Sequence, residues 1–303
     1  MLKKITETFT QGSIGTTLSM KLSQACPSKI GYAIAGYIAG VIAARWWNPV
    51  VQAVRLNQAV AHDFKLGYHG LNRAVRRVFV SQSRSLYNFY HYLDRIEHIQ
   101  KLVRISPAMQ KVMDESNKGG RGTLLLIPHL CGFDLGGLLL ASKGFKFLIL
   151  SYPNPPKGYE MQNKLRTDRG EEVMPMSFES MQLARERLQT GGIVLTGIDR
   201  PHPGSGYHPL FFGRPAELPV AYVKLALKTN ARVHVVAFQN LPDLTYKIDA
   251  SEEIALSPME DPKEELETNA ARILKVAEGY IRKNPASWAM FYPVWPELEA
   301  ELK

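Results

Sequence analysis

The sequence predicts an α/β fold in which a mixed, largely parallel central sheet is flanked by helices and preceded by a basic helical region. From residue 116 onwards, short strands that are apolar along their whole length alternate with helical patterns, which is typical of a sheet covered on both faces. Before that point, apolar residues recur at three- and four-residue steps, as they do on helices. We therefore expect two regions, residues 1–115 and residues 116–303.

Composition narrows the class of protein. Of the 303 residues, 45% are hydrophobic, so a sizeable core is expected. The two cysteines, Cys26 and Cys131, show no pairing pattern and no metal-ligand spacing. This argues against a disulfide framework or a metal site, and it favours a reducing compartment.

Charge is distributed unevenly along the chain, whose formal net charge is +9. Residues 1–110 contain 14 Lys or Arg and 4 Asp or Glu, which gives +10, whereas the remaining residues give −1. Such asymmetry indicates that the first third binds an anionic surface, either a membrane or a nucleic acid. The absence of a recognisable nucleic-acid-binding module favours the membrane. A charge bias that only keeps the protein soluble is the alternative.

An uncharged segment, "IGYAIAGYIAGVIAA" (30–44), lies between Lys29 and the three residues Arg45, Trp46 and Trp47. It has about 15 residues, fewer than the roughly 20 that span a bilayer. The tryptophans and flanking cations are typical of a helix that lies in the membrane interface or dips into it. A buried helix of the N-terminal region is the alternative.

Residues 64–93 are predicted to form a long amphipathic helix. Its apolar face contains Phe64, Tyr68, Leu71, Val75, Val78, Leu86, Phe89 and Leu93. Its basic face contains Lys65, Arg73, Arg76, Arg77 and Arg84. An anionic membrane recruits helices of this kind, although the apolar face can instead pack into the core.

In the second region, strands are predicted at residues 123–127, 145–151, 192–196 and 232–238. Helices are predicted at about residues 133–143, 157–169, 178–190, 217–229 and 262–283. Active sites in such folds gather at the carboxyl ends of the strands.

One histidine directly follows a predicted strand, in the stretch "TLLLIPHLCGFD" (123–134). Of the eight histidines, only His129 has an acidic residue, Asp134, five positions later. Taken alone, the spacing fits a structural histidine near an unrelated aspartate as well as a catalytic pair. Its interpretation therefore depends on the rest of the chain.

Further blocks supply that context: "NKLRTDRGEEVMPM" (163–176), "GGIVLTGIDR" (191–200), "GYHPLFFGRPAELPVAYVKLALKTNARV" (206–233) and "RKNPASWAMFYPVWP" (282–296). Together with "PHLCGFD", their order and spacing resemble the bacterial late acyltransferases of lipid A biosynthesis and the related phosphatidylinositol mannoside acyltransferases. The resemblance covers most of the chain. His129 and Asp134 take the positions of the family's His-four-residues-acid motif. Lipid A enzymes commonly have Glu at the second position, whereas the mannoside enzymes resemble this chain in having Asp.

The resemblance implies an O-acyltransferase that needs no cofactor or metal ion. It would move a fatty acyl group from acyl-CoA or acyl-carrier protein to a hydroxyl of a glycolipid or lysophospholipid. His129 is expected to act as general base, with Asp134 accepting a hydrogen bond from its other ring nitrogen. The expected substrate-binding residues are Arg166, Asp199, Phe212, Gly213 and Arg214. Among them, Arg166 would bind a phosphate, and Asp199 would support His129 or orient the acceptor hydroxyl.

The expected location is the cytoplasmic face of the cell membrane, peripheral or shallowly anchored. Two alternatives remain for the function: an acyl thioesterase, which gives the acyl group to water, and a catalytically inactive, membrane-binding member of the fold. A thiol nucleophile at Cys131 is an alternative for the chemistry, to which the resemblance assigns no role.

Overall fold

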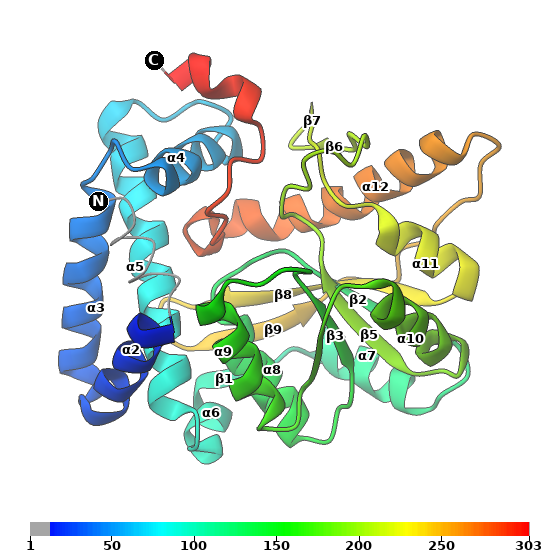
Figure 1. Cartoon of the computed structure of the whole chain (residues 1–303), viewed down its shortest axis with the longest axis horizontal. Helices are drawn as coiled ribbons and strands as arrows, with labels where there is room; N and C mark the ends of the chain where they lie inside the picture. The colour runs from blue at the N-terminus through cyan, green and yellow to red at the C-terminus, as the bar shows by residue number, and fades with distance from the viewer. Residues whose placement is uncertain (1–12, 303) are drawn as a thin grey trace.

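The computed structural model describes residues 13–302. The first 12 residues of the expected N-terminal region lie outside this part. The helices are α2 (Ser13–Ala25), α3 (Ser28–Ala43), α4 (Pro49–Ala61), α5 (Tyr68–Tyr92), α6 (Ile96–Leu102), α7 (Pro107–Asn117), α8 (Phe133–Ser142), α9 (Lys157–Thr167), α10 (Phe178–Gln189), α11 (Ala221–Thr229) and α12 (Pro262–Lys283), followed by the short 3-10 helices η1 (Pro285–Ser287) and η2 (Pro296–Leu302) (Figure 1).

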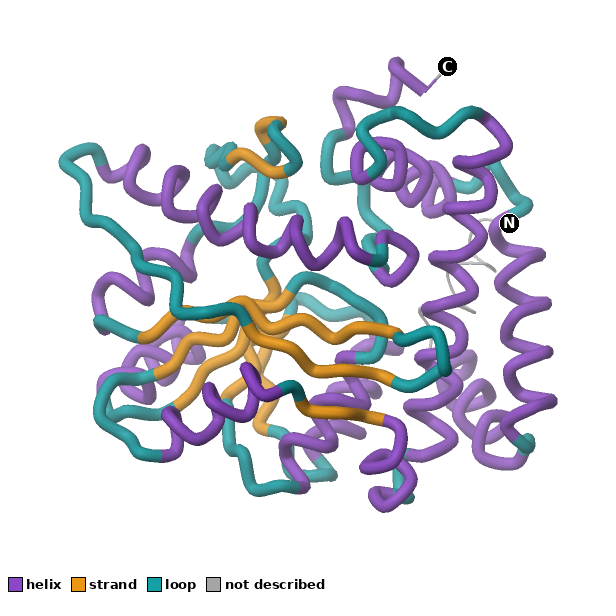
Figure 2. The backbone as a smooth tube through the Cα atoms, turned by 180° about the vertical axis from the view of Figure 1, so that it is seen from behind, coloured by secondary structure: helices purple, strands orange, loops and turns teal. Residues whose placement is uncertain are grey.

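The strands are β1 (Val103–Ile105), β2 (Thr123–Ile127), β3 (Leu148–Ser151), β4 (Glu172–Pro175), β5 (Ile193–Gly197), β6 (Leu210–Phe211), β7 (Arg214–Pro215), β8 (Arg232–Asn240) and β9 (Tyr246–Ala250). A seven-stranded sheet has the order β1-β9-β8-β2-β5-β3-β4, and β6 and β7 form a separate hairpin. Only the β8–β9 pair of the large sheet is antiparallel. Figure 2 shows this sheet as a layer between helices. The predicted α/β class with a mixed, largely parallel sheet is confirmed.

The predicted strands correspond to β2, β3, β5 and β8, and the predicted helices to α8–α12. Helix α11 begins four residues later than expected, after Pro219, because the residue before a proline is driven out of the helical region and proline itself cannot donate a helical hydrogen bond. Strands β1 and β4 were not predicted, since they have only three and four residues, and β9 was not predicted because its buried residues alternate with partly exposed ones. Strand β1 pairs with β9, so the sheet includes residues from both expected regions.

The core lies on both faces of the sheet, as the central strand β2 shows. Leu124 and Leu126 pack in one cluster with residues of α10, α11 and α12, whereas Leu125 and Ile127 pack in another with residues of α5, α7 and α8. Side chains alternate between the two faces of a strand. A strand with helices over both faces is therefore apolar at every position.

Side-chain caps fix where several helices begin. Asn48 accepts a hydrogen bond from the backbone N–H of Val50 at the start of α4, and Ser106 accepts one from Met109 in α7. Asp261 accepts from two backbone N–H groups at the start of α12. Each such cap contributes about 1 kcal/mol to helix stability.

Helix α5 packs inside the protein. Its residues Leu71, Val75, Val78 and Phe89 are buried. Helix α3 lies along it, and a Cβ atom at Gly31 would lie 2.1 Å from the ring of Tyr87, so only glycine permits this approach. Of the two interpretations of the amphipathic segment 64–93, the structure therefore favours a helix packed into the core. This helix begins at Tyr68, which is itself 69% exposed.

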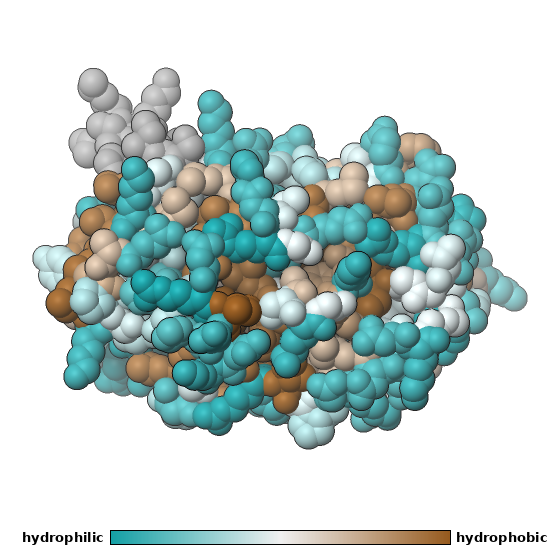
Figure 3. Space-filling model, turned by 90° about the horizontal axis from the view of Figure 1, so that it is seen from below, coloured by the Kyte–Doolittle hydropathy of each residue, from teal (hydrophilic) through white to brown (hydrophobic). Residues whose placement is uncertain are grey.

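The outer face of α3, by contrast, is apolar and exposed. Its exposed large side chains are Ile30, Ile34, Tyr37, Ile38 and Val41. Trp46 and Trp47, which follow the helix, are 67% and 66% exposed. Hydrophobic surface is visible along the left edge of Figure 3, the side on which α3 lies in Figure 1. Within residues 13–302, no helix combines the length and hydropathy needed to cross a membrane.

Candidate active site

His129 lies where the central strand leaves the sheet. Strand β2 ends at Ile127, and β5 runs beside it in parallel, with Ile127 opposite Gly197. The carboxyl ends of β2 and β5 therefore meet at one edge. A Cβ atom at Gly197 would lie 2.8 Å from Cε1 of His129, so this glycine makes room for the imidazole.

Asp199, two residues after β5, holds His129 at two points. Its Oδ1 lies 2.5 Å from Nδ1 of His129, and its Oδ2 accepts a hydrogen bond of 2.9 Å from the backbone N–H of His129. Asp199 is fully buried, whereas the His129 side chain is 28% exposed. An ionised carboxylate only accepts hydrogen bonds, so in a neutral imidazole this contact favours the tautomer with the hydrogen on Nδ1 and the lone pair on Nε2.

Trp288 completes the surroundings of the buried carboxylate. Its Nε1 donates a hydrogen bond of 2.8 Å to Oδ2 of Asp199. The same C-terminal segment is fixed to the strand end, because the N–H of Ala289 donates to the carbonyl of His129 and the N–H of Cys131 donates to the carbonyl of Ser287, both at 2.8 Å. Hydrogen bonds to all sides of the carboxylate offset the cost of burying its charge.

The expected hydrogen bond between His129 and Asp134 is not formed. Asp134 lies in the first turn of α8, and its Oδ1 accepts from Nε and Nη2 of Arg166 at 3.0 and 2.5 Å. Both residues are buried. A buried arginine requires a carboxylate partner. Asp134 is that partner for Arg166 of α9. The residue that contacts the imidazole is Asp199, in one of the two roles predicted for it.

Arg166 is enclosed by protein and is not placed to bind a substrate phosphate. It lies 5.2 Å from the ring centroids of both Phe133 and Tyr159, and its Nη1 donates to Oδ1 of Asn163 at 2.6 Å. Burial lowers the pKa of Arg166, but the charge and hydrogen bond of Asp134, together with Tyr159 and Glu171, raise it above the ordinary value overall. The expectation that Arg166 binds a phosphate is corrected accordingly: its guanidinium fixes α8 to α9.

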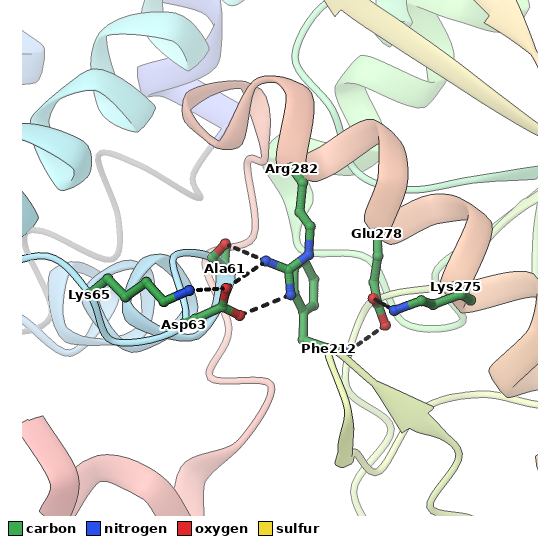
Figure 4. A network of polar contacts seen from close by, with 7 residues as sticks. All are labelled: Ala61, Asp63, Lys65, Phe212, Lys275, Glu278 and Arg282. Carbon is green, nitrogen blue, oxygen red and sulfur yellow. Dashed lines mark hydrogen bonds and ion pairs between the residues drawn. The ribbon is translucent and has the colours of Figure 1, made fainter.

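Phe212 and Gly213 form the turn between β6 and β7. Phe212 has a left-handed backbone (φ +52°), held by a 2.5 Å hydrogen bond from its N–H to Oε1 of the buried Glu278. Its ring stacks on Trp288 with the centroids 5.7 Å apart. The guanidinium carbon of Arg282 lies 4.8 Å from the centroid of the Phe212 ring (Figure 4). Phe212 thus supports the tryptophan that binds Asp199.

Arg214 lies on the outer side of this hairpin. It is 3.9 Å from a carboxylate oxygen of Glu301 and 5.1 Å from the ring centroid of Phe64. Its guanidinium forms no ion pair with His129, Asp199 or another residue of the site. The expected role in substrate binding stays a prediction for Arg214, and for Phe212 and Gly213 as well.

Cys131 is buried, and its thiol donates a 3.4 Å hydrogen bond to Oε1 of Gln82. Burial raises the pKa of this thiol above its ordinary value. Because the thiolate is the nucleophilic form, Cys131 is not suited to covalent catalysis. Among residues 13–302, no three His, Cys, Asp or Glu side chains are grouped as ligands for a metal ion.

Glu171 lies beside the Asp134–Arg166 pair, and its buried carboxyl group has a raised pKa. Its Oε1 is buried without a hydrogen-bond partner, in space left by Gly137, where a Cβ atom would lie 2.8 Å away. Burial raises the pKa of Glu171 to about 7, although Arg166 lowers it.

This carboxyl group is expected to make folding stability fall as pH rises from about 4.5 to about 7. In that interval the native state keeps the proton that the unfolded state loses, so the native state binds more protons and stability decreases with pH. The contribution is about 3 kcal/mol. Glu171→Gln, which cannot ionise, should therefore gain stability relative to the wild type between pH 5 and pH 8 in urea unfolding. The exposed Glu186→Gln is the control, and an equal pH dependence in Glu171→Gln and the wild type would contradict the expectation.

Sequence reasoning missed Gly197 as the residue that admits the imidazole and Trp288 as a partner of Asp199. Gly197 was present in "TGID" and Trp288 in "NPASW", but neither pattern states what the residue contacts. Only the pairing of β2 with β5 and the position of the C-terminal segment bring them together.

Comparisons with known proteins show which proteins the chain is similar to. The family described as bacterial lipid A biosynthesis acyltransferase matches residues 96–297. A phosphatidylinositol mannoside acyltransferase of Mycobacterium tuberculosis is 28% identical over 123 residues, and one of Mycolicibacterium smegmatis is 27% identical over 121 residues. The aligned segments span 39% of this chain and only 39% and 40% of the length of these relatives.

Proposed function

The chain belongs to the bacterial lipid A biosynthesis acyltransferase family, and from this premise we propose that it transfers a fatty acyl group from acyl-CoA or acyl-carrier protein to a hydroxyl of a glycolipid or lysophospholipid. The observation that carries the proposal is the His129–Asp199 pair at the carboxyl edge of the sheet. It presents an imidazole whose Nε2 is free to accept a proton.

The chemistry requires no protein nucleophile. Nε2 of His129 takes the proton of the acceptor hydroxyl as that oxygen attacks the thioester carbon. A carbon–oxygen bond forms, the carbon–sulfur bond breaks, and the imidazolium returns the proton to the leaving thiolate. Asp199 stabilises the imidazolium and keeps the proton on Nδ1 throughout, as the aspartate of a Ser-His-Asp triad does.

Lipid mass spectrometry of the native host with and without this gene tests the proposal. Loss of the gene should produce a lipid lighter by one acyl chain, and its mass difference identifies acceptor and chain length together. With the purified protein, release of free thiol from acyl-CoA should depend on the lipid acceptor. Thiol release that is the same without any acceptor would instead show a thioesterase.

We further propose that the exposed face of α3, together with Trp46 and Trp47, lies in the interface of the cytoplasmic face of the cell membrane. The apolar residues of α3 recur at three- and four-residue steps along one side. Lys21, Lys29 and Arg45 flank them, and cations beside interfacial tryptophans bind anionic lipid headgroups. The excess positive charge of the first third supports the same surface.

Replacing both tryptophans by serine is expected to release the protein from membranes. Each buried indole contributes roughly 1.5–3 kcal/mol, so Trp46→Ser/Trp47→Ser should weaken vesicle binding by at least about tenfold. Sedimentation with phosphatidylglycerol-containing vesicles measures this. Phe178→Ser removes an aromatic side chain from α10 that is 80% exposed, more than either tryptophan, and is the control. Binding that is unchanged in the double variant would argue against this surface.

A further inference from the structure

An arginine beside the catalytic pair has an unusual environment. Arg200 follows Asp199 directly, and its guanidinium carbon lies 3.7 Å from the ring centroid of Tyr152 and 4.1 Å from that of Tyr292. The guanidinium is therefore held between two aromatic rings, each of which attracts the cation.

The three residues come from separate segments that meet at the edge of the sheet where His129 lies. Tyr152 follows β3, which is parallel to β5, with Leu150 opposite Thr196. The segment that contains Tyr292 is anchored by Asn57, whose Nδ2 donates to the carbonyls of Met290 and Tyr292 at 3.0 and 2.8 Å. The arrangement is thus fixed by the fold.

Arg200 has no anionic partner within the described part of the chain. Both oxygens of the adjacent Asp199 are used by His129 and Trp288, and no carboxylate of residues 13–302 lies within ion-pair distance of its guanidinium. Arg232 and Arg272, which also lack a carboxylate, donate to backbone carbonyls instead. Arg200 makes no such bond.

The aromatic rings also determine what this cation can bind. Both ring centroids lie within 4.1 Å of the guanidinium carbon, and the edge of the group carries the N–H donors. That edge is a rigid fork that fits two oxygens of a phosphate or carboxylate group. Holding the fork in place in advance reduces the entropy lost on binding. Since Tyr152 and Tyr292 are 40% and 41% exposed, a ligand can reach this edge from solvent.

We propose that Arg200, held between Tyr152 and Tyr292, binds a phosphate group of a substrate beside His129. The inference rests on the proposed acyl transfer and gives it a more specific substrate class, a phosphate ester. Two substrates can supply this group: the acyl donor, through the phosphates of its coenzyme or phosphopantetheine part, and the acceptor lipid, through its headgroup.

Equilibrium binding of two probes to the full chain tests the proposal: coenzyme A, and micelles of lysophosphatidylinositol. A bidentate, charge-assisted contact with phosphate accounts for about tenfold to a hundredfold in affinity. Arg200→Gln should therefore weaken binding of one probe by at least about tenfold, and Arg200→Lys by less. Tyr292→Phe, which keeps the ring, should bind as the wild type does, whereas Tyr292→Leu should be weakened.

The matched control is Arg185→Gln, which removes the same charge from an exposed position on α10. A loss confined to coenzyme A assigns the site to the donor, and a loss confined to the lipid assigns it to the acceptor. Unchanged affinity of Arg200→Gln for both probes overturns the proposal, as does a wild-type protein that binds neither probe. Binding needs no turnover, so Arg200-dependent binding in a protein without transferase activity would support the phosphate site and contradict the proposed function.

Discussion

Asp199→Asn is expected to lower the turnover number of acyl transfer about 10³- to 10⁴-fold, while Asp134→Asn should act mainly on stability. Oδ1 of Asp199 receives the Nδ1–H of His129. An asparagine amide can present its NH₂ group there, which stabilises the tautomer with the proton on Nε2. That tautomer cannot take a proton from the acceptor, and the same substitution in a Ser-His-Asp triad has an effect of about this size.

His129→Ala should abolish transfer without unfolding the protein, because Asp199 still accepts from the backbone N–H of residue 129 and from Trp288. The double variant His129→Ala/Asp199→Asn should be no worse than His129→Ala, since residues that act as a unit do not contribute additively. Single-turnover kinetics with acyl-CoA, accompanied by circular dichroism, measures both effects. A folded His129→Ala protein with near-normal turnover would exclude His129 as the general base.

Comparing Asp199→Asn with Asp134→Asn tests which aspartate supports His129. The motif assigns the support of His129 to Asp134, whereas the structure places Asp199 there. If Asp134→Asn lost turnover as Asp199→Asn does while keeping wild-type stability, the assignment to Asp199 would be incorrect.

Asp134→Asn is expected to lower the free energy of unfolding by about 3–5 kcal/mol, because it leaves the buried charge of Arg166 without a carboxylate. The side chains of the pair are only 4% and 6% exposed. Solvent therefore screens the uncompensated charge little. The remaining hydrogen-bond partner of the guanidinium, the amide oxygen of Asn163, is neutral, and the nearby Glu171 interacts with Arg166 without forming an ion pair.

Urea unfolding of Asp134→Asn, of the control Asp168→Asn and of a double variant at positions 134 and 166 measures this effect. Asp134→Leu/Arg166→Met removes both charges, and it should be more stable than Asp134→Asn, because paired removal leaves no buried cation without its carboxylate. The control is Asp168→Asn, which disrupts the exposed Lys164–Asp168 pair and should cost less than about 1 kcal/mol. A similar cost for Asp134→Asn and Asp168→Asn would show that burial does not govern the first pair.

Much of the fold follows from local patterns. The run "TLLLI" is apolar at every position and becomes β2, the strand that is buried on both faces, because side-chain alternation exposes both faces of a strand to the neighbouring layers. Likewise, Asp261 and Pro262 mark the start of α12, which begins where it was expected. Such signals lie within a few residues of each other, so the sequence is sufficient to read them.

The amphipathic segment 64–93 shows where local patterns are insufficient. From Leu71 to Leu93 its apolar face was correctly located, whereas Phe64 precedes the helix and Tyr68 is exposed. A face of this kind can be covered by a membrane or by protein. Packing against α3 and the core covers it in this molecule, and leaves the outer face of α3 exposed instead.

The sequence by itself determined the α/β class, the position of His129 after the central strand, and the order of blocks typical of the acyltransferase family. The tertiary structure alone decided which carboxylate holds His129 and which cation stays free of a partner beside it. Residue spacing along the chain specifies neighbours only within one helix or turn. Asp199, Trp288, Tyr152 and Tyr292 reach the site through strand pairing and chain reversal, so their contacts with His129 and Arg200 depend on distances in space.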